Sequence, residues 1–82
     1  MIAHRRDVFL RRNPRAYEVA RDLNNLAQLL QATNRLAEAE PLMRRALAID
    51  EQSFGAEHPR VATELNNLAL LLKDTNRLAA AE

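Results

Sequence analysis

Two pairs of asparagines recur in this sequence at a fixed spacing. Asn24-Asn25 and Asn66-Asn67 each lie inside the five-residue sequence Leu-Asn-Asn-Leu-Ala, and the second copy begins 42 positions after the first. A side-chain amide offers both donors and an acceptor, so it can pair with any polypeptide backbone. Asn25 and Asn67 are therefore candidates for a ladder of peptide-binding groups. The alternative is that these amides bond to neighbouring helices or face water.

The other reactive side chains do not form a catalytic or metal-binding pattern. His4 and His58 are the only histidines, and neither has the i, i+4 partner that a helical zinc site needs. There is no cysteine, which excludes thiolate chemistry and disulfides. The carboxylates Glu38, Glu40, Asp50 and Glu51 are predicted on helix exteriors, where pairs such as Glu40–Arg44 add a few tenths of a kcal/mol. We expect no enzyme, no cofactor and no metal.

Basic residues gather at the start of the chain. Residues 1–15 contain five arginines (Arg5, Arg6, Arg11, Arg12 and Arg15) against the single acid Asp7, although the formal net charge is only +1. Such a cluster suits nucleic acid or an acidic partner, because arginine neutralises phosphate and carboxylate. Neither a recognition motif nor interleaved aromatic residues accompany it, which disfavours nucleic acid.

The composition indicates an all-α fold. Of 82 residues, 48% are hydrophobic but only 4% are aromatic, and there is one glycine. Abundant Ala and Leu favour closely packed helices. No apolar run approaches the roughly 20 residues that span a bilayer, and residues 1–10 lack the features of a signal peptide. We therefore expect a soluble, cytoplasmic protein without a membrane partner.

Helical periodicity and breakers place the elements. Apolar residues at steps of three and four predict helices over about 15–32 and 36–52, joined by a turn at 33–35 with Asn34 in the left-handed conformation. Pro59 is predicted to start a third helix that ends near Asp74, after a loop over 53–58. A second turn at 75–77 would repeat the first, and residues 78–82 would begin another helix.

The same periodicity predicts the core. Leu23, Leu26 and Ala27, with their copies Leu65, Leu68 and Ala69, are expected to face it. Four alanines fall where large side chains would hold helices apart, so they are expected at close helix contacts: Ala20, Ala27, Ala39 and Ala46.

The asparagine pairs belong to a longer tandem repeat. Residues 19–40 match residues 61–82 at 16 of 22 positions when offset by 42. Fixed periods of about 20–50 residues are typical of solenoids, in which small units stack to bury their apolar faces. We predict an α-solenoid of antiparallel helix pairs with about one and a half repeats. Its segments are a remnant or capping helix (1–12), a first repeat (13–58) and an incomplete second repeat (59–82).

Several short motifs resemble a known family. Leu26-Ala27, Leu30, Leu36, Ala39, Met43, Ala46 and Leu47 have the spacing of tetratricopeptide repeats. Leu-Asn-Asn-Leu-Ala, Arg-Arg-Ala-Leu-Ala-Ile at 44–49 and Gly-Ala-Glu-His-Pro at 55–59 are similar to the 42-residue repeats of kinesin light chains and their bacterial relatives.

The resemblance implies a binding surface. In such arrays the first helix of each repeat lines a concave face that binds extended peptides. On this sequence the lining would be Arg21, Asn24, Asn25, Gln28, Gln31, Thr63, Asn66, Asn67, Leu70 and Lys73. The expected function is a non-enzymatic scaffold for a peptide or protein partner. The alternative is a structural or self-assembling fragment of a longer array, which forms homo-oligomers through exposed repeat ends.

Overall fold

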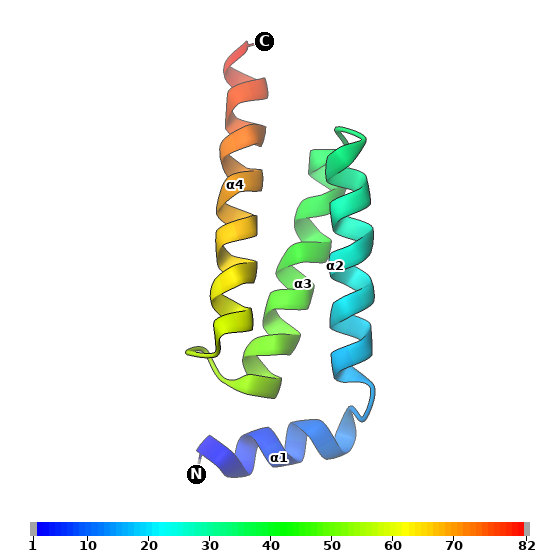
Figure 1. Cartoon of the computed structure of the whole chain (residues 1–82), viewed down its shortest axis with the longest axis vertical. Helices are drawn as coiled ribbons and strands as arrows, with labels where there is room; N and C mark the ends of the chain where they lie inside the picture. The colour runs from blue at the N-terminus through cyan, green and yellow to red at the C-terminus, as the bar shows by residue number, and fades with distance from the viewer. Residues whose placement is uncertain (1, 82) are drawn as a thin grey trace.

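The computed structural model describes the backbone of residues 2–81 and the side chains of residues 6–76. Its helices are α1 (Ile2–Arg12), α2 (Ala16–Ala32), α3 (Leu36–Phe54) and α4 (Pro59–Ala81). Helices α2, α3 and α4 lie side by side with α3 in the middle, and α1 crosses the foot of α2 and α3 (Figure 1). No strand occurs within these residues. The predicted all-α fold of antiparallel helix pairs is confirmed.

The turn between α2 and α3 forms as predicted. Asn34 has a positive φ of 63°, a conformation that asparagine tolerates better than most residues. The backbone N–H of Arg35 donates to Leu30 O at 2.7 Å. The N–H of Asn34 donates to Gln31 O at 3.0 Å. These bonds satisfy carbonyls that the end of a helix otherwise leaves unpaired.

The loop between α3 and α4 is tight. Helix α3 runs to Phe54, two residues beyond the predicted end, and Gly55 follows with φ 92°. This backbone conformation requires glycine, whereas the nearest atom to a Cβ at Gly55 would be Arg6 Nη2 at 2.6 Å, the end of a flexible side chain that can move away. His58 Nδ1 accepts a hydrogen bond from the backbone N–H of Arg60 at 3.1 Å. It thus caps α4, which begins at Pro59 as predicted.

The predicted second turn at 75–77 is wrong, because α4 continues to Ala81. The side-chain hydroxyls of Thr33 and Thr75 both donate to the backbone carbonyl four residues earlier, at 3.1 Å and 2.9 Å. This bond is therefore compatible with a turn or with a continuing helix. The turn after Thr33 lets α3 pack against α2 and bury Leu36. Within the described residues no helix follows α4 and packs back on it in this way, and a turn without such burial gains little.

The predicted alanine contacts are confirmed. Ala20, Ala27, Ala39 and Ala46 are all completely buried. Small side chains at these positions let α2 and α3 approach closely, while larger residues fill the space around them. The central cluster contains residues from α2, α3 and α4, which are Ala27, Leu36, Ala39, Met43, Leu68 and Leu71.

The predicted core is only partly right within the two Leu-Asn-Asn-Leu-Ala copies. Ala27 and Leu68 are buried, and Leu23 is half-buried. The other three residues are exposed: Leu26, Leu65 and Ala69. The reason is that the copies use different stripes of the same pattern. Helix α2 turns Ala20 and Ala27 to α3, whereas α4 turns Val61, Leu68 and Leu71 to it.

Helix α1 covers most of the segment predicted as a remnant or cap. Asn13 ends it, because its Nδ2 donates to Phe9 O at 3.0 Å and its backbone N–H donates to the same oxygen at 2.9 Å. The side chains of residues 1–5, including Arg5, lie outside the described part, and the boundaries at 12–13 and 58–59 stay predictions. No helix in the described part is long and apolar enough to cross a membrane.

Candidate functional site

The surface predicted to bind peptides lies on α2 and α4. Most of its residues are exposed, and three are half-buried. The exposed ones are Arg21, Asn25, Gln28, Thr63, Asn66, Leu70 and Lys73, and the half-buried ones are Asn24, Gln31 and Asn67. Two of them are engaged locally: Thr63 Oγ1 donates to Pro59 O at 3.1 Å, and Arg21 pairs with Asp22 at 3.4 Å.

Asn24 is a link between helices. Its Nδ2 donates to Glu64 Oε2 at 3.1 Å, which joins α2 to α4 across the middle of the molecule. The alternative for the asparagines, a bond to a neighbouring helix, therefore holds for Asn24. Asn25 and Asn66 keep exposed amides, and no hydrogen bond between described side chains uses them.

A buried polar cluster lies beneath this surface, and sequence reasoning missed it. Asp50, which was predicted on a helix exterior, is completely buried. It follows Ala39, Met43 and Ala46 at helical steps and so continues the buried stripe of α3. Arg60 Nε pairs with Asp50 Oδ2 at 3.0 Å. The pairing of Glu40 with Arg44 at 3.0 Å is confirmed on the exterior of the same helix.

Glu64 is the second buried acid of the cluster, with 6% of its surface exposed. Burial first, and then the neighbouring Asp50, together raise the pKa of Glu64 to about 7 against the opposing effects of Asn24 and Arg60. Asp50 Oδ1 and Glu64 Oε1 are buried without a hydrogen-bond partner among the described residues. A proton on Glu64 would form a hydrogen bond with the neighbouring Asp50 carboxylate, which is how paired carboxylates reduce their repulsion.

Aromatic rings hold the arginine of this cluster in place. The guanidinium carbon of Arg60 lies 4.5 Å from the ring centroid of Tyr17 and 5.9 Å from that of Phe54, within the range of cation–π attraction. Phe54 also stacks on His58 at 4.6 Å and meets Tyr17 edge to face at 6.3 Å. Arg60 therefore ties the start of α2 and the end of α3 to the start of α4.

The role of the cluster is to hold the helices in position. Asp50 and Glu64 carry the carboxylates, but both are almost fully buried, so they do not present a general acid or base to a substrate at the surface. No group of three or more potential metal ligands occurs in the described part. The signal for Glu64 was available in the sequence, because Val61, Glu64, Leu68 and Leu71 follow one helical stripe.

Comparison with known proteins gave one match. A family model described as a tetratricopeptide repeat matches residues 15–82. This range contains α2, α3 and α4, together with both asparagine pairs and the buried cluster. No curated protein and no solved structure matched the chain.

Proposed function

Because the chain belongs to the tetratricopeptide repeat family, we propose that it is a non-enzymatic interaction module whose α2 and α4 surface binds an extended peptide segment of a protein partner. Repeats of this family generally mediate interactions between proteins. The observation that carries the proposal is that Asn25 is exposed and its repeat equivalent Asn67 is half-exposed, on two helices joined by the Asn24–Glu64 bond. We propose that its repeats are of the kinesin light chain type. We also propose that the protein acts in the cytoplasm.

The mechanism rests on preorganisation. A peptide backbone needs donors and acceptors at fixed positions, which an amide on a rigid helix supplies at little entropic cost. The Asn24–Glu64 bond joins α2 to α4 and the Asp50–Arg60 pair joins α3 to α4, which holds the helices in a fixed relation before a peptide arrives. Asn25, with Asn67 one repeat further along, would then pair with successive stretches of the peptide backbone.

A second candidate function is self-assembly, favoured by two exposed apolar faces. On α2, Val19, Leu26 and Leu29 are 39%, 47% and 61% exposed. On α4, Leu65 and Leu72 are 49% and 37% exposed. Stacking the α4 face of one copy on the α2 face of another would cover both. Because the two faces differ, this contact is head-to-tail and produces open-ended oligomers.

A peptide-selection experiment tests the first function. The full chain would be screened against a displayed library of nine-residue peptides, and binding of selected peptides would be measured by fluorescence anisotropy. We expect the double variant Asn25→Ala and Asn67→Ala to weaken binding about tenfold or more, because each lost neutral hydrogen bond costs roughly 0.5–1.5 kcal/mol. The matched control is Gln52→Ala, an exposed amide on α3. Equal binding by the double variant and the control would remove the ladder mechanism.

Sedimentation velocity tests the second function. Head-to-tail assembly predicts a weight-average mass that rises with concentration and falls back to the monomer value in the variant Leu29→Glu. Leu29 is the most exposed of the large apolar residues, so this change leaves the core intact. A strict monomer at high micromolar concentration would contradict self-assembly and leave the peptide proposal standing.

A further inference from the structure

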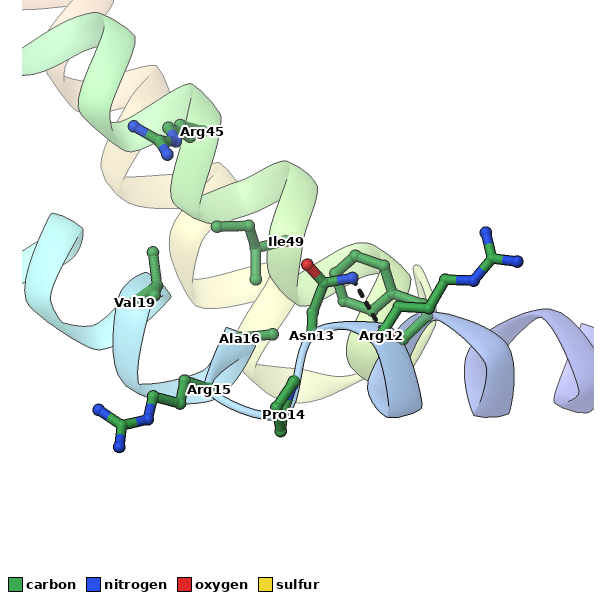
Figure 2. Close-up of a pocket in the computed structure, with 9 residues that line it drawn as sticks. Arg12, Asn13, Pro14, Arg15, Ala16, Val19, Arg45 and Ile49 are labelled. Atoms are coloured by element: carbon green, nitrogen blue, oxygen red, sulfur yellow. Dashed lines mark hydrogen bonds between the residues drawn. The ribbon is translucent and has the colours of Figure 1, made fainter.

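A hollow lies where the end of α1, the start of α2 and the outer side of α3 meet (Figure 2). Its volume is about 530 Å³, within the range of small-molecule and peptide side-chain pockets. Its apolar lining includes Phe9, Val19 and Ile49. The hollow is separate from the surface on α2 and α4, since α3 contributes to it and α4 does not.

The hollow is formed by a braced turn. Asn13 fixes the chain between α1 and α2 through its two bonds to Phe9 O, one of which Figure 2 shows as a dashed line. The backbone N–H of Ala16 then donates to Asn13 O at 3.0 Å. Pro14, next to Asn13, limits the backbone further. The lining is therefore in place without a ligand, which reduces the entropic cost of binding one.

The rim of the hollow is positively charged. Arg12, Arg15 and Arg45 stand on different sides of it (Figure 2), and no acidic residue lines it. All three side chains are exposed, and none takes part in an ion pair between described side chains. Guanidinium groups around an apolar hollow are complementary to a ligand that carries both carboxylates and an apolar group.

We propose that this hollow binds a short acidic peptide segment of a protein partner, with an apolar side chain inserted between Phe9, Val19 and Ile49 and with flanking carboxylates on Arg12, Arg15 and Arg45. Nucleic acid fits less well. Single strands bind by stacking successive bases on several aromatic rings, and Phe9 is the one aromatic residue of the lining. The proposal does not depend on peptide binding by α2 and α4.

The probe is a labelled, end-blocked pentapeptide, Asp-Glu-Phe-Leu-Glu, with an amide twin, Asn-Gln-Phe-Leu-Gln. Anisotropy would be measured with the full chain at a concentration where sedimentation shows one species. We expect the acidic peptide to bind about tenfold more tightly than its twin, with a preference that shrinks as salt is added. Tighter binding of a single-stranded oligonucleotide than of the acidic peptide would overturn the proposal.

Neighbouring arginines provide matched controls. Arg12→Gln and Arg45→Gln should each weaken binding of the acidic peptide roughly two- to fivefold, as expected for exposed ion pairs. The control variants Arg11→Gln and Arg44→Gln should change this binding by less than about twofold. Val19→Ser should weaken binding of the acidic peptide and of its amide twin by the same factor, because it changes the apolar lining only. Circular dichroism would confirm that each variant is folded.

Two results would overturn the assignment. Equal losses in the Arg11 and Arg12 variants would mean that general charge attraction, and no defined pocket, binds the peptide. If Arg45→Gln lowered the sedimentation mass of the free chain while peptide binding stayed the same, the occupant of the hollow would be a second copy of this chain. Unchanged binding in the Asn25 and Asn67 double variant is expected, since that surface is separate.

Discussion

Helices α2 and α4 contain the same Leu-Asn-Asn-Leu-Ala sequence and bury different parts of it. In α2 the alanine, Ala27, is fully buried and Leu26 is 47% exposed, whereas in α4 the equivalent Ala69 is exposed and Leu68 is 6% exposed. Both helices pack on α3, and they also meet each other through the Asn24–Glu64 bond. The comparison shows that the repeated pattern encodes two apolar stripes, and that the position of the neighbouring helix decides which one is buried.

The largest effect is expected at the pair Leu29 and Leu71. Leu71 is fully buried and its repeat equivalent, Leu29, is 61% exposed. Leu71→Ala should lower the free energy of unfolding by about 2–5 kcal/mol, because it removes buried methyl groups and leaves a cavity. Leu29→Ala should change it by no more than about 0.5 kcal/mol. Urea denaturation followed by circular dichroism measures both, and equal costs would show that the two stripes are equally buried.

Enlarging the repeated alanine tests the comparison from the opposite direction. Ala27→Leu should destabilise the fold by about 1–3 kcal/mol, because a larger side chain must fit the close contact between α2 and α3. Ala69→Leu should be nearly neutral, since its position on α4 is exposed. The measurement is again the urea midpoint. Destabilisation of similar size at Ala69 would reveal a partner on that face, including a second copy of the chain.

The acids at equivalent positions should differ in their pH response. Glu64 is buried with a pKa raised from 4.5 to about 7, while its equivalent Asp22 is exposed. The folded state holds the Glu64 proton more tightly than the unfolded state. This contribution is therefore fully present below about pH 4.5 and is lost as the pH rises through about 7.

Glu64→Gln isolates this term. The variant should remove a pH-dependent change of roughly 3 kcal/mol in the free energy of unfolding between pH 4.5 and 8, and it should be relatively more stable than the parent at the upper end. Asp22→Asn is the matched control and should leave the slope intact. Denaturation curves across this pH range give the answer. An unchanged slope in Glu64→Gln would mean that Glu64 is ionised throughout.

The smallest effect, with opposite signs in the two copies, is expected at the asparagines of the repeated Thr-Asn-Arg sequence. Asn34 has a positive φ, so Asn34→Ala should cost about 1 kcal/mol. Asn76 lies within α4, so Asn76→Ala should stabilise the helix by a few tenths of a kcal/mol. Thermal melts of the two variants should therefore shift in opposite directions. A matching loss at Asn76 would indicate that α4 ends in a turn after all.

Local signals predicted most of the helix boundaries. Asn34 ends α2 and Pro59 begins α4 because their backbone preferences act within a few residues, whatever packs nearby. The same reasoning failed at Thr75, where Thr-Asn-Arg-Leu-Ala repeats the sequence that begins at Thr33, but no further helix follows within the described residues to pack back as α3 does. A turn that depends on tertiary burial cannot be derived from its own residues.

The buried cluster escaped prediction for a different reason. Asp50 and Glu64 lie on apolar stripes, but the usual assignment of acids to exposed faces placed Asp50 outside. What makes its burial tolerable is Arg60, ten residues later, and the rings that hold it. A buried charge is tolerated where the fold also places its partner next to it. The position of Arg60 depends on the path of the loop at Gly55.

The contacts of Arg60 hold α4 near its first residue, so a change in them would tilt the helix. This guanidinium, next to the first residue of α4, is held by Asp50 of α3 and the ring of Tyr17 of α2. Helix α4 has 23 residues, which corresponds to about 35 Å. A tilt of about 5° at Arg60 would therefore move the far end of α4 by about 3 Å. Such a tilt would also shift Leu68 and Leu71, so it would require the central cluster to repack.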